Sequence, residues 1–217
     1  MGIVSGFLDL LFPPRCVFCR RFVEHGSGLI CPDCEKHLPY TGNGGERHGD
    51  FFSVCIAPLY YEKDVRKSLH RYKFGGASSY AETYGPLLAD SVRRNLTGEY
   101  DIISWVPVSR KRLRERGYDQ ARLLAEAAAR ALDTEAVRTL QKIRDTEKQS
   151  TIGSAEKRRA NIAGAYRVPE PERVMGKRVL LIDDIVTTCS TLSECAGTLK
   201  RAGAEKVLCA ALARRRD

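Results

Sequence analysis

Two adjacent carboxylates, Asp183 and Asp184, end an aliphatic run in the stretch RVLLIDDIVTTCST, and small, mostly hydroxylated residues follow them. Neighbouring carboxylates repel each other and need a partner that holds them ionised, such as the vicinal hydroxyls of a sugar or a divalent cation. The hydroxyl segment comprises Thr187, Thr188, Cys189, Ser190 and Thr191. It precedes a predicted helix, so its N–H groups and hydroxyls form a favourable anion site. The pattern therefore indicates a ribose 5-phosphate pocket.

A purely structural explanation of the same segment is a polar turn that caps the helix, with Thr191 and Glu194 forming a capping box. This explains the threonine and the glutamate but gives no reason for the acidic pair. Two other phosphate-binding motifs are excluded, because the chain contains neither G-x-x-x-x-G-K-[ST] nor G-x-G-x-x-G.

Four cysteines have the spacing C-x2-C-x11-C-x2-C, namely Cys16, Cys19, Cys31 and Cys34. Each pair can place two thiolates on one tight turn, so that four sulfurs surround a tetrahedral zinc ion. The alternatives are a redox dithiol or simple buried thiols, but a redox C-x-x-C normally opens a helix of a βαβ unit. Because four thiolates close the coordination sphere, we expect this zinc to be structural and not catalytic.

Two basic segments provide candidates for binding the anionic part of such a ligand. The first, SRKRLRERGYDQ, directly follows a predicted strand and so leaves the sheet at the same edge as the acidic pair. The second runs from Lys142 to Tyr166, lacks a core face and is predicted to be a lid. The candidates for binding pyrophosphate or for a role in the lid are Arg110, Arg112, Arg116, Gly117, Arg144 and Lys148.

Alternating strands and helices would position these groups. The predicted strands cover 53–61, 101–108, 178–184 and 206–213, and the predicted helices cover 65–74, 120–132 and 191–204. This alternation predicts an α/β fold with a mostly parallel, twisted sheet flanked by helices. A glycine-rich bridge at 41–50 separates it from the cysteine-bearing start. The expected domains are 1–45, with an N-terminal helix and the four-cysteine zinc ribbon, and 51–217.

The charge of the chain favours anionic partners. It has 36 Lys and Arg against 27 Asp and Glu in 217 residues, a formal charge of +9, which suits phosphorylated metabolites, nucleic acid or acidic lipid. The N-terminal MGIVSGFLDLLFPP lacks a basic start, is broken by Asp9 and is stopped by Pro13, so it fits neither a signal peptide nor a membrane span. We therefore expect a cytoplasmic protein.

The stretch VLLIDDIVTTCST resembles the signature of the type I phosphoribosyltransferases, which bind 5-phosphoribosyl-1-pyrophosphate (PRPP). The resemblance implies that Asp183 and Asp184 hold the ribose hydroxyls during catalysis and that Thr187 to Thr191 wrap the 5-phosphate. It also implies Mg²⁺ bound together with PRPP. Cys189 stands where the signature usually has glycine. If that position requires a positive φ, the cysteine adds strain and weakens phosphate binding; if it requires only a close approach of the backbone, a small thiol is tolerated.

The order of motifs resembles the ComF family of competence-associated, phosphoribosyltransferase-like proteins over essentially the whole chain. The likeness rests on LLFPPRCVFC with CPDC, on LHRYKFGG, on VPVSRKRLRERGYDQARLLA and on the PRPP signature. Family sequences usually read R-G-F-N-Q where this chain has Arg116 to Gln120, so Asp119 replaces an amide with a charge.

Two functions follow from these resemblances. The first is a magnesium-dependent, PRPP-binding enzyme that transfers or hydrolyses at the ribose anomeric carbon and is linked to DNA uptake and natural transformation. The second is a non-catalytic protein that senses PRPP or a nucleotide and binds single-stranded DNA through its basic loops, with other DNA-uptake proteins as partners. The fold resemblance is compatible with a homodimer.

Overall fold

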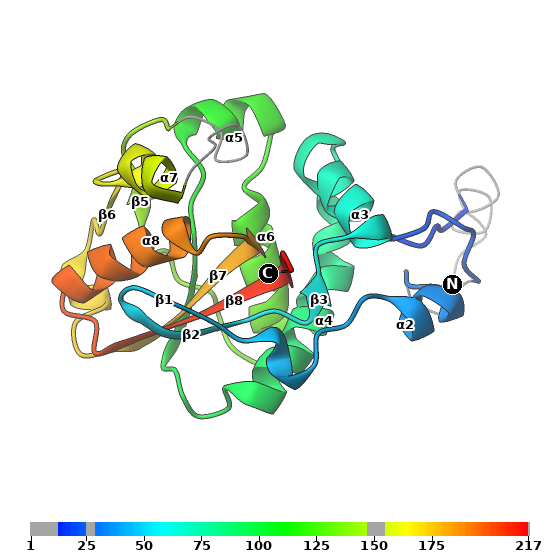
Figure 1. Ribbon diagram of the computed structural model, residues 1–217, viewed down its shortest axis with the longest axis horizontal. Coiled ribbons are helices and arrows are strands. Elements are labelled where there is room, and N and C mark those ends of the chain that lie inside the picture. Colours follow the sequence, from blue (N-terminus) through cyan, green and yellow to red (C-terminus); the bar gives the residue numbers. More distant parts are fainter. Residues whose placement is uncertain (1–12, 25–28, 147–154, 217) are drawn as a thin grey trace, which may run out of the picture.

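The computed structural model describes residues 13–24, 29–146 and 155–216; the predicted N-terminal helix and Lys148 lie outside these ranges. A twisted sheet crosses the centre of the molecule in the order β1-β2-β8-β7-β4, with β3 also paired to β8 (Figure 1). The strands are β1 Arg47–Gly49, β2 Phe52–Ile56, β3 Leu59–Tyr60, β4 Ile102–Trp105, β7 Arg178–Val186 and β8 Lys206–Arg214. Every pairing in this sheet is parallel except that of β1 with β2, which confirms the predicted mostly parallel sheet.

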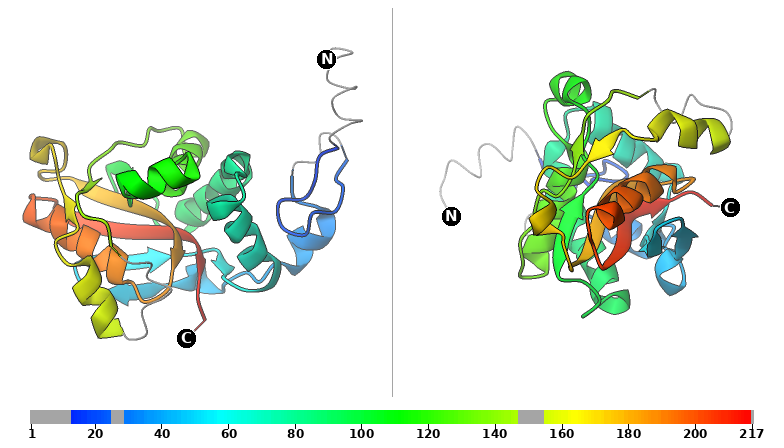
Figure 2. Two further views of the ribbon diagram at one scale, coloured as in Figure 1. Left: turned by 90° about the horizontal axis from the view of Figure 1, so that it is seen from above. Right: turned by 90° about the vertical axis from the view of Figure 1, so that its left-hand side faces the viewer.

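Helices cover both faces of the sheet, as Figures 1 and 2 show. The helices α3 Lys63–Phe74, α4 Ala81–Asn95 and α6 Gln120–Ala131 pack on one face, and α8 Ser190–Arg201 packs on the other. Successive side chains of a strand point to opposite faces. Accordingly Leu180 and Ile182 of β7 join the cluster under α3, α4 and α6, whereas Val179 and Leu181 join the cluster under α8. Burial on both faces explains the unbroken aliphatic run before the acidic pair.

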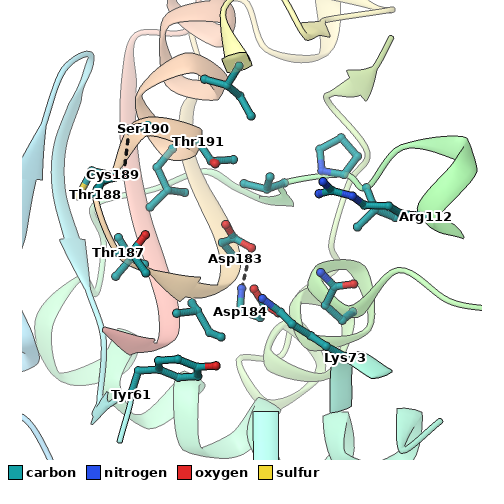
Figure 3. A pocket seen from close by; sticks show the side chains of 18 of the residues that line it. Tyr61, Lys73, Arg112, Asp183, Asp184, Thr187, Thr188, Cys189, Ser190 and Thr191 are labelled. Carbon is teal, nitrogen blue, oxygen red and sulfur yellow. Dashed lines mark hydrogen bonds and ion pairs between the residues drawn. The ribbon is translucent and has the colours of Figure 1, made fainter. Parts of the chain in front are cut away.

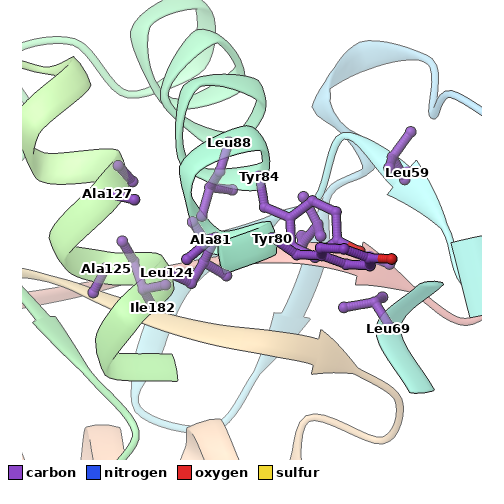
Figure 4. Close-up of a cluster of buried hydrophobic side chains, with 14 of the residues drawn as sticks. Leu59, Leu69, Tyr80, Ala81, Tyr84, Leu88, Leu124, Ala125, Ala127 and Ile182 are labelled. Atoms are coloured by element: carbon purple, nitrogen blue, oxygen red, sulfur yellow. The ribbon is translucent and has the colours of Figure 1, made fainter. Parts of the chain in front are cut away.

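The helices α4 and α6 pack closely over the first face (Figure 4). A Cβ atom at Gly85 would lie 2.5 Å from the Cβ of Ala127, so only glycine allows this approach of the two backbones. Leu88 and Leu124 are completely buried in the same cluster. Helix α6 was predicted from its apolar face, whereas α4 was not predicted.

The cysteine-bearing region lies at one end of the molecule beside α3 (Figure 1). It consists of a turn at Cys16–Cys19 and the short helix α2 Pro32–His37. Val17 and Phe18 are buried, and the Phe18 ring packs against Tyr84 of α4 with a centroid distance of 5.8 Å. This region therefore shares its apolar contacts with the larger domain.

Three predicted segments differ in detail from the structure. The predicted strand 53–61 divides into β2 and β3 around Pro58, whose nitrogen cannot donate a ladder hydrogen bond. The first basic segment is not an open loop but the helix α5 Arg110–Arg116. The predicted lid contains an antiparallel pair and a helix, namely β5 Gln141–Lys142, β6 Tyr166–Arg167 and α7 Ala155–Ile162.

The remaining elements are short 3₁₀ turns, namely η1 Asn43–Gly45, η2 Ser78–Tyr80 and η4 Pro171–Arg173. Among the described residues, no helix is both long and apolar enough to cross a membrane.

Candidate functional site

A cavity of about 560 Å³ opens at the carboxyl ends of the parallel strands (Figure 3). Its walls come from the segments that follow β3, β4, β7 and β8, as expected for an open α/β sheet. The charged and hydroxyl side chains that line it are Tyr61, Arg66, Lys73, Arg112, Arg116, Lys142, Tyr166, Asp183, Asp184, Thr187, Thr188, Ser190, Thr191 and Arg215. The structure thus brings the acidic pair and the hydroxyl segment into one cavity.

The acidic pair lies inside β7, because the strand continues to Val186, whereas the sequence placed it where the strand ends. Strand alternation directs the Cα–Cβ bonds of the two residues to opposite faces of the sheet, but their carboxylates remain close enough to interact. Asp184 is buried, and its Oδ2 lies 2.8 Å from the Nζ of Lys73 on α3. The carboxylate of Asp183 accepts a hydrogen bond of 2.8 Å from the N–H of Asp184. Figure 3 shows both carboxylates between the hydroxyl segment and the cations Lys73 and Arg112.

Burial and the neighbouring Asp184 raise the pKa of Asp183 well above its ordinary value, and Lys73 partly opposes this increase. A ligand whose hydroxyls donate hydrogen bonds to Asp183 would stabilise its ionised form. The acidic pair therefore has the chemistry to bind a diol, as the sequence indicated.

The hydroxyl segment connects β7 to α8 and includes the first residues of that helix. Cys189 is the N-cap residue, has φ +57° and makes no side-chain capping hydrogen bond. The hydroxyls of Thr188 and Ser190 lie 3.0 Å apart. Because first-turn N–H groups have no acceptor within their own helix, they are available to an anion at this position.

The capping-box alternative is wrong. Thr191 lies inside α8, and the N-cap is Cys189. Glu194 instead accepts a hydrogen bond of 2.9 Å from the N–H of Gly164, which ties the segment after α7 to α8.

Arg47 of β1 supports the hydroxyl segment and was not identified from the sequence. Its guanidinium donates to the carbonyl of Thr187 at 3.3 Å and to the carbonyl of Arg215 at 2.9 Å. It therefore joins the chain after β7 to the chain after β8. The sequence offers no signal for this contact, because the partners are 140 and 168 residues away.

The predicted pyrophosphate and lid residues divide into those that line the cavity and those that do not. Arg112 and Arg116 of α5 line the cavity, whereas Arg110, Gly117 and Arg144 do not. Gly117 has φ +80° and ends α5, so its glycine serves helix termination. Arg144 donates to the carbonyls of Asn161 and Ala163 at 3.1 and 2.7 Å. It thereby links the start of the predicted lid to the end of α7.

Lys142 lines the cavity and was missed as a site residue. Its ammonium donates to the hydroxyl of Thr146 at 3.0 Å and lies 5.2 Å from the centre of the Tyr166 ring. Burial, with a smaller contribution from Arg112, lowers the pKa of Lys142 to about 8. The neighbouring Ile143 is 54% exposed, whereas Lys142 is buried. The register of β5 therefore buries the charged side chain and exposes the apolar one. Composition alone would have placed the isoleucine inside.

The α3 side of the cavity was also missed. Lys73 and Phe74 end α3, and Tyr61 and Arg66 lie at its beginning or just before it. Lys73 and Phe74 fall in the LHRYKFGG block, which had served only to establish the resemblance, whereas Tyr61 and Arg66 precede it. Helical spacing indicated that Tyr72 is buried and could therefore have indicated that Lys73 lies at the edge of that face.

Asp119, which replaces the usual asparagine, holds the backbone. Its carboxylate accepts hydrogen bonds from the N–H of Arg122 at 3.2 Å, as the N-cap of α6, and from the N–H of Val108 at 3.1 Å. Burial raises its pKa, and the backbone N–H groups oppose this increase. Because its oxygens act as acceptors in both bonds, an aspartate serves this position.

The four cysteines Cys16, Cys19, Cys31 and Cys34 converge as predicted, with all four Sγ atoms within 4.8 Å of one another. The Sγ atoms of Cys19 and Cys31 are 3.6 Å apart. Two sulfurs of a tetrahedral zinc site with ~2.3 Å bonds lie ~3.8 Å apart, so the residues fit this metal. Cys31 also caps α2, where its sulfur accepts the N–H of Cys34 at 3.4 Å. The donor set and its spacing support structural zinc.

Two family models match the chain in agreement with this architecture. Residues 7–56 match the double zinc ribbon domain, and residues 119–217 match the phosphoribosyl transferase domain. The fold and site thus define a phosphoribosyltransferase-like domain preceded by a zinc ribbon.

Curated relatives identify the family. The chain is 36% identical to the DNA utilization protein YhgH of Escherichia coli O157:H7, over 88% of this chain and 86% of that protein. It is 28% identical to Competence protein F of Haemophilus influenzae, over 92% and 96%. It is 26% identical to Competence protein ComFC of Bacillus subtilis, over 90% and 82%. The chain belongs to the ComF family.

A solved glutamine PRPP amidotransferase from B. subtilis is a more distant neighbour. It is 23% identical, with a TM-score of 0.42, and the match covers 61% of this chain and 26% of the amidotransferase chain.

Proposed function

We propose that the cavity binds PRPP and that the protein transfers or hydrolyses at the ribose anomeric carbon. The observation that carries this proposal is the placement of Asp183, Asp184 and the N-terminus of α8 in one cavity. Diol acceptors lie next to an anion site there, and cations line the remaining walls. A ribose with a 5-phosphate at one end and a pyrophosphate at the other matches this distribution of charge.

Each group of cavity residues would bind a different part of PRPP. Asp183 and Asp184 would accept hydrogen bonds from the ribose hydroxyls, and the N–H groups of residues 187–191 would donate to the 5-phosphate. Arg112, Arg116 and Lys142 would face the pyrophosphate. When the bond from the anomeric carbon to oxygen breaks, the electron pair leaves with the pyrophosphate and positive charge develops on the sugar. Cations at the leaving group and carboxylates at the sugar would stabilise both charges.

Magnesium fits this site as a companion of the pyrophosphate. Mg²⁺ is usually held by one or two carboxylates together with substrate phosphates and water. Among the described residues, the four cysteines are the one group of three or more close His, Cys, Asp or Glu ligands, so the cavity has no protein cage for the ion. Mg²⁺ brought in with PRPP would neutralise the leaving group, while Asp183 and Asp184 hold the sugar.

Turnover tests this proposal. Purified protein with PRPP and Mg²⁺ is assayed for pyrophosphate release in the absence of an acceptor and with a panel of nucleobases and amines. Release that needs an acceptor indicates transfer, and release without one indicates hydrolysis. Saturable PRPP binding without release would contradict the catalytic part and leave a sensing role.

The second candidate function is a non-catalytic role in the handling of DNA, favoured by the names of the relatives and the charge of +9. In this proposal, the protein acts in the cytoplasm during DNA uptake, senses PRPP or a nucleotide, and binds single-stranded DNA. A homodimer and other DNA-uptake proteins are its proposed assembly and partners. Phosphate contacts would make DNA binding fall steeply with salt, so a flat salt dependence would contradict it.

A further inference from the structure

A second groove lies along α3, outside the sheet-edge cavity. It has a volume of about 580 Å³ and is lined by Lys63, Arg66, Lys67, His70 and Arg71, which we call the α3 basic stripe. Arg66 lines both the groove and the cavity, so the two spaces meet at its side chain. None of the residues proposed to bind PRPP lines this groove.

The stripe is an unfavourable arrangement for a helix. Its residues are spaced i, i+3, i+4, i+7 and i+8 and so occupy one side of α3, where like charges destabilise the helix. Three contacts relieve part of it: Asp64 forms an ion pair of 3.0 Å with Lys67, Glu62 interacts with Lys63, and Arg71 donates to the carbonyls of Val17 and Phe18. Within the described ranges, Arg66 has no side-chain hydrogen bond or ion pair. Such a stripe favours a ligand that brings negative charge.

The aromatic ring of Phe74 lies at the end of α3, next to the α3 basic stripe and in the wall of the cavity. Phe74 is 54% exposed and lines the cavity. The His70 ring lies 5.0 Å from it between centroids, and the Arg116 guanidinium lies 4.8 Å from its centre. Tyr61 lines the same cavity. An exposed ring beside cations is a platform on which a nucleobase can stack.

We propose that the α3 side of the site binds a phosphate-bearing nucleotide as its second ligand, with the base near Phe74 and the phosphate on the α3 basic stripe. This inference rests on the proposed PRPP pocket, which would place the nucleotide beside the anomeric carbon. A neutral nucleobase would use the ring but not the stripe. The nucleotide can be a free nucleoside monophosphate or the terminal nucleotide of a DNA strand, since both present a base with a phosphate.

Calorimetric titration of the full chain tests the proposal with AMP, adenosine and a 5′-phosphorylated single-stranded 12-mer. The stripe variant is Lys63→Gln/Lys67→Gln. Its matched control, Lys177→Gln/Lys200→Gln, removes the same charge from exposed lysines near the opposite end of β7. We expect AMP or the 12-mer to bind at least about tenfold tighter than adenosine, and the stripe variant alone to lose this advantage. Binding of AMP indicates the free nucleotide, and binding of the 12-mer alone indicates the strand end.

Equal affinity for AMP, adenosine and the 12-mer, or an unchanged affinity in the stripe variant, would overturn the inference. For the 12-mer, loss of one phosphate contact should reduce the slope of log affinity against log salt by about 0.7. PRPP is titrated into the same proteins and should bind the stripe variant within about twofold of wild type. Failure of wild type to bind PRPP would defeat the proposed pocket, whatever the nucleotide results show.

Discussion

The zinc ribbon and the sheet-edge cavity both gather groups that can carry negative charge, but they differ in how that charge is compensated. In the ribbon, four sulfurs converge within 4.8 Å of one another. In the cavity, Asp183 and Asp184 lie side by side on β7, and Asp184 is paired with Lys73 at 2.8 Å. The ribbon is therefore built to retain one cation, whereas the two carboxylates of the cavity lie among six cationic side chains and can exchange these partners for a ligand.

Helix α3 connects the two regions. Its Arg71 donates hydrogen bonds of 2.7 Å to the carbonyls of Val17 and Phe18, the residues between the first two cysteines. The hydroxyl of Ser68 also donates to the carbonyl of Val17. Two residues beyond Arg71, Lys73 contacts the acidic pair. The ribbon thus anchors the helix that supplies one wall of the cavity.

The largest expected effect is the loss of zinc in Cys16→Ser. A structural zinc contributes about 10–16 kcal/mol to folding, so the ribbon should lose both its metal and its protection from proteases. Metal analysis and limited proteolysis measure these changes. Cys209→Ala is the matched control, because Cys209 is buried in β8 and outside the cluster. Full zinc retention in Cys16→Ser would contradict the assignment of four cysteine ligands.

The connection through α3 should be broken by Arg71→Met. Loss of two hydrogen bonds from a charged donor should lower the free energy of unfolding by about 2–4 kcal/mol. It should also speed the release of zinc to a chelator, which denaturant unfolding alone would not reveal. Arg94→Met on the exposed side of α4 is the control. Zinc release at the wild-type rate would show that the ribbon does not depend on α3.

The pH dependence of PRPP affinity distinguishes the two sides of the cavity. Asp183 has a raised pKa, so it is protonated at low pH, and affinity should rise as it ionises. Lys142 has a pKa of about 8, so affinity for the pyrophosphate should fall above that pH as its charge is lost. Titrations from roughly pH 5.5 to 9.5 measure both trends. Lys142→Met should abolish the fall on the alkaline side, and a fall that persists would exclude Lys142.

The smallest effect is expected at Cys189, which has φ +57°. Glycine would relieve a left-handed conformation that costs about 1–2 kcal/mol, but would lose the burial of the thiol. Cys189→Gly should therefore change the free energy of unfolding by less than about 1 kcal/mol, whereas Cys189→Val should destabilise by about 2 kcal/mol. Denaturant unfolding measures both. A glycine variant less stable than the valine variant would show that φ does not limit this position.

Local patterns predicted the parts of the molecule that short stretches of chain determine. The spacing of the cysteines, the buried strand β7 and the apolar face of α6 each occupy one continuous segment. The helix α5 was missed because Leu113 is its one apolar residue, so it has no apolar face, although Ser109 caps it with a hydrogen bond of 3.3 Å.

Contacts between distant segments could not be predicted in the same way. Lys73 meets Asp184 across 111 residues of sequence, which is the difference between their positions. Lys142 enters the cavity because of the register of β5 with β6, and neither strand has a strong pattern of its own. Tertiary packing decides such positions, and a single sequence contains little trace of it.

Calorimetric titration with PRPP and Mg²⁺ tests the central claim most directly. Wild type should bind PRPP at one saturable site, and Asp183→Asn/Asp184→Asn should weaken binding at least about 100-fold, because two charged acceptors are lost. Asp133→Asn, which removes a carboxylate from an exposed position outside the cavity, should keep the wild-type affinity and serves as the control. Absence of PRPP binding to wild type, or equal affinity in the double variant, would contradict the assignment of the acidic pair.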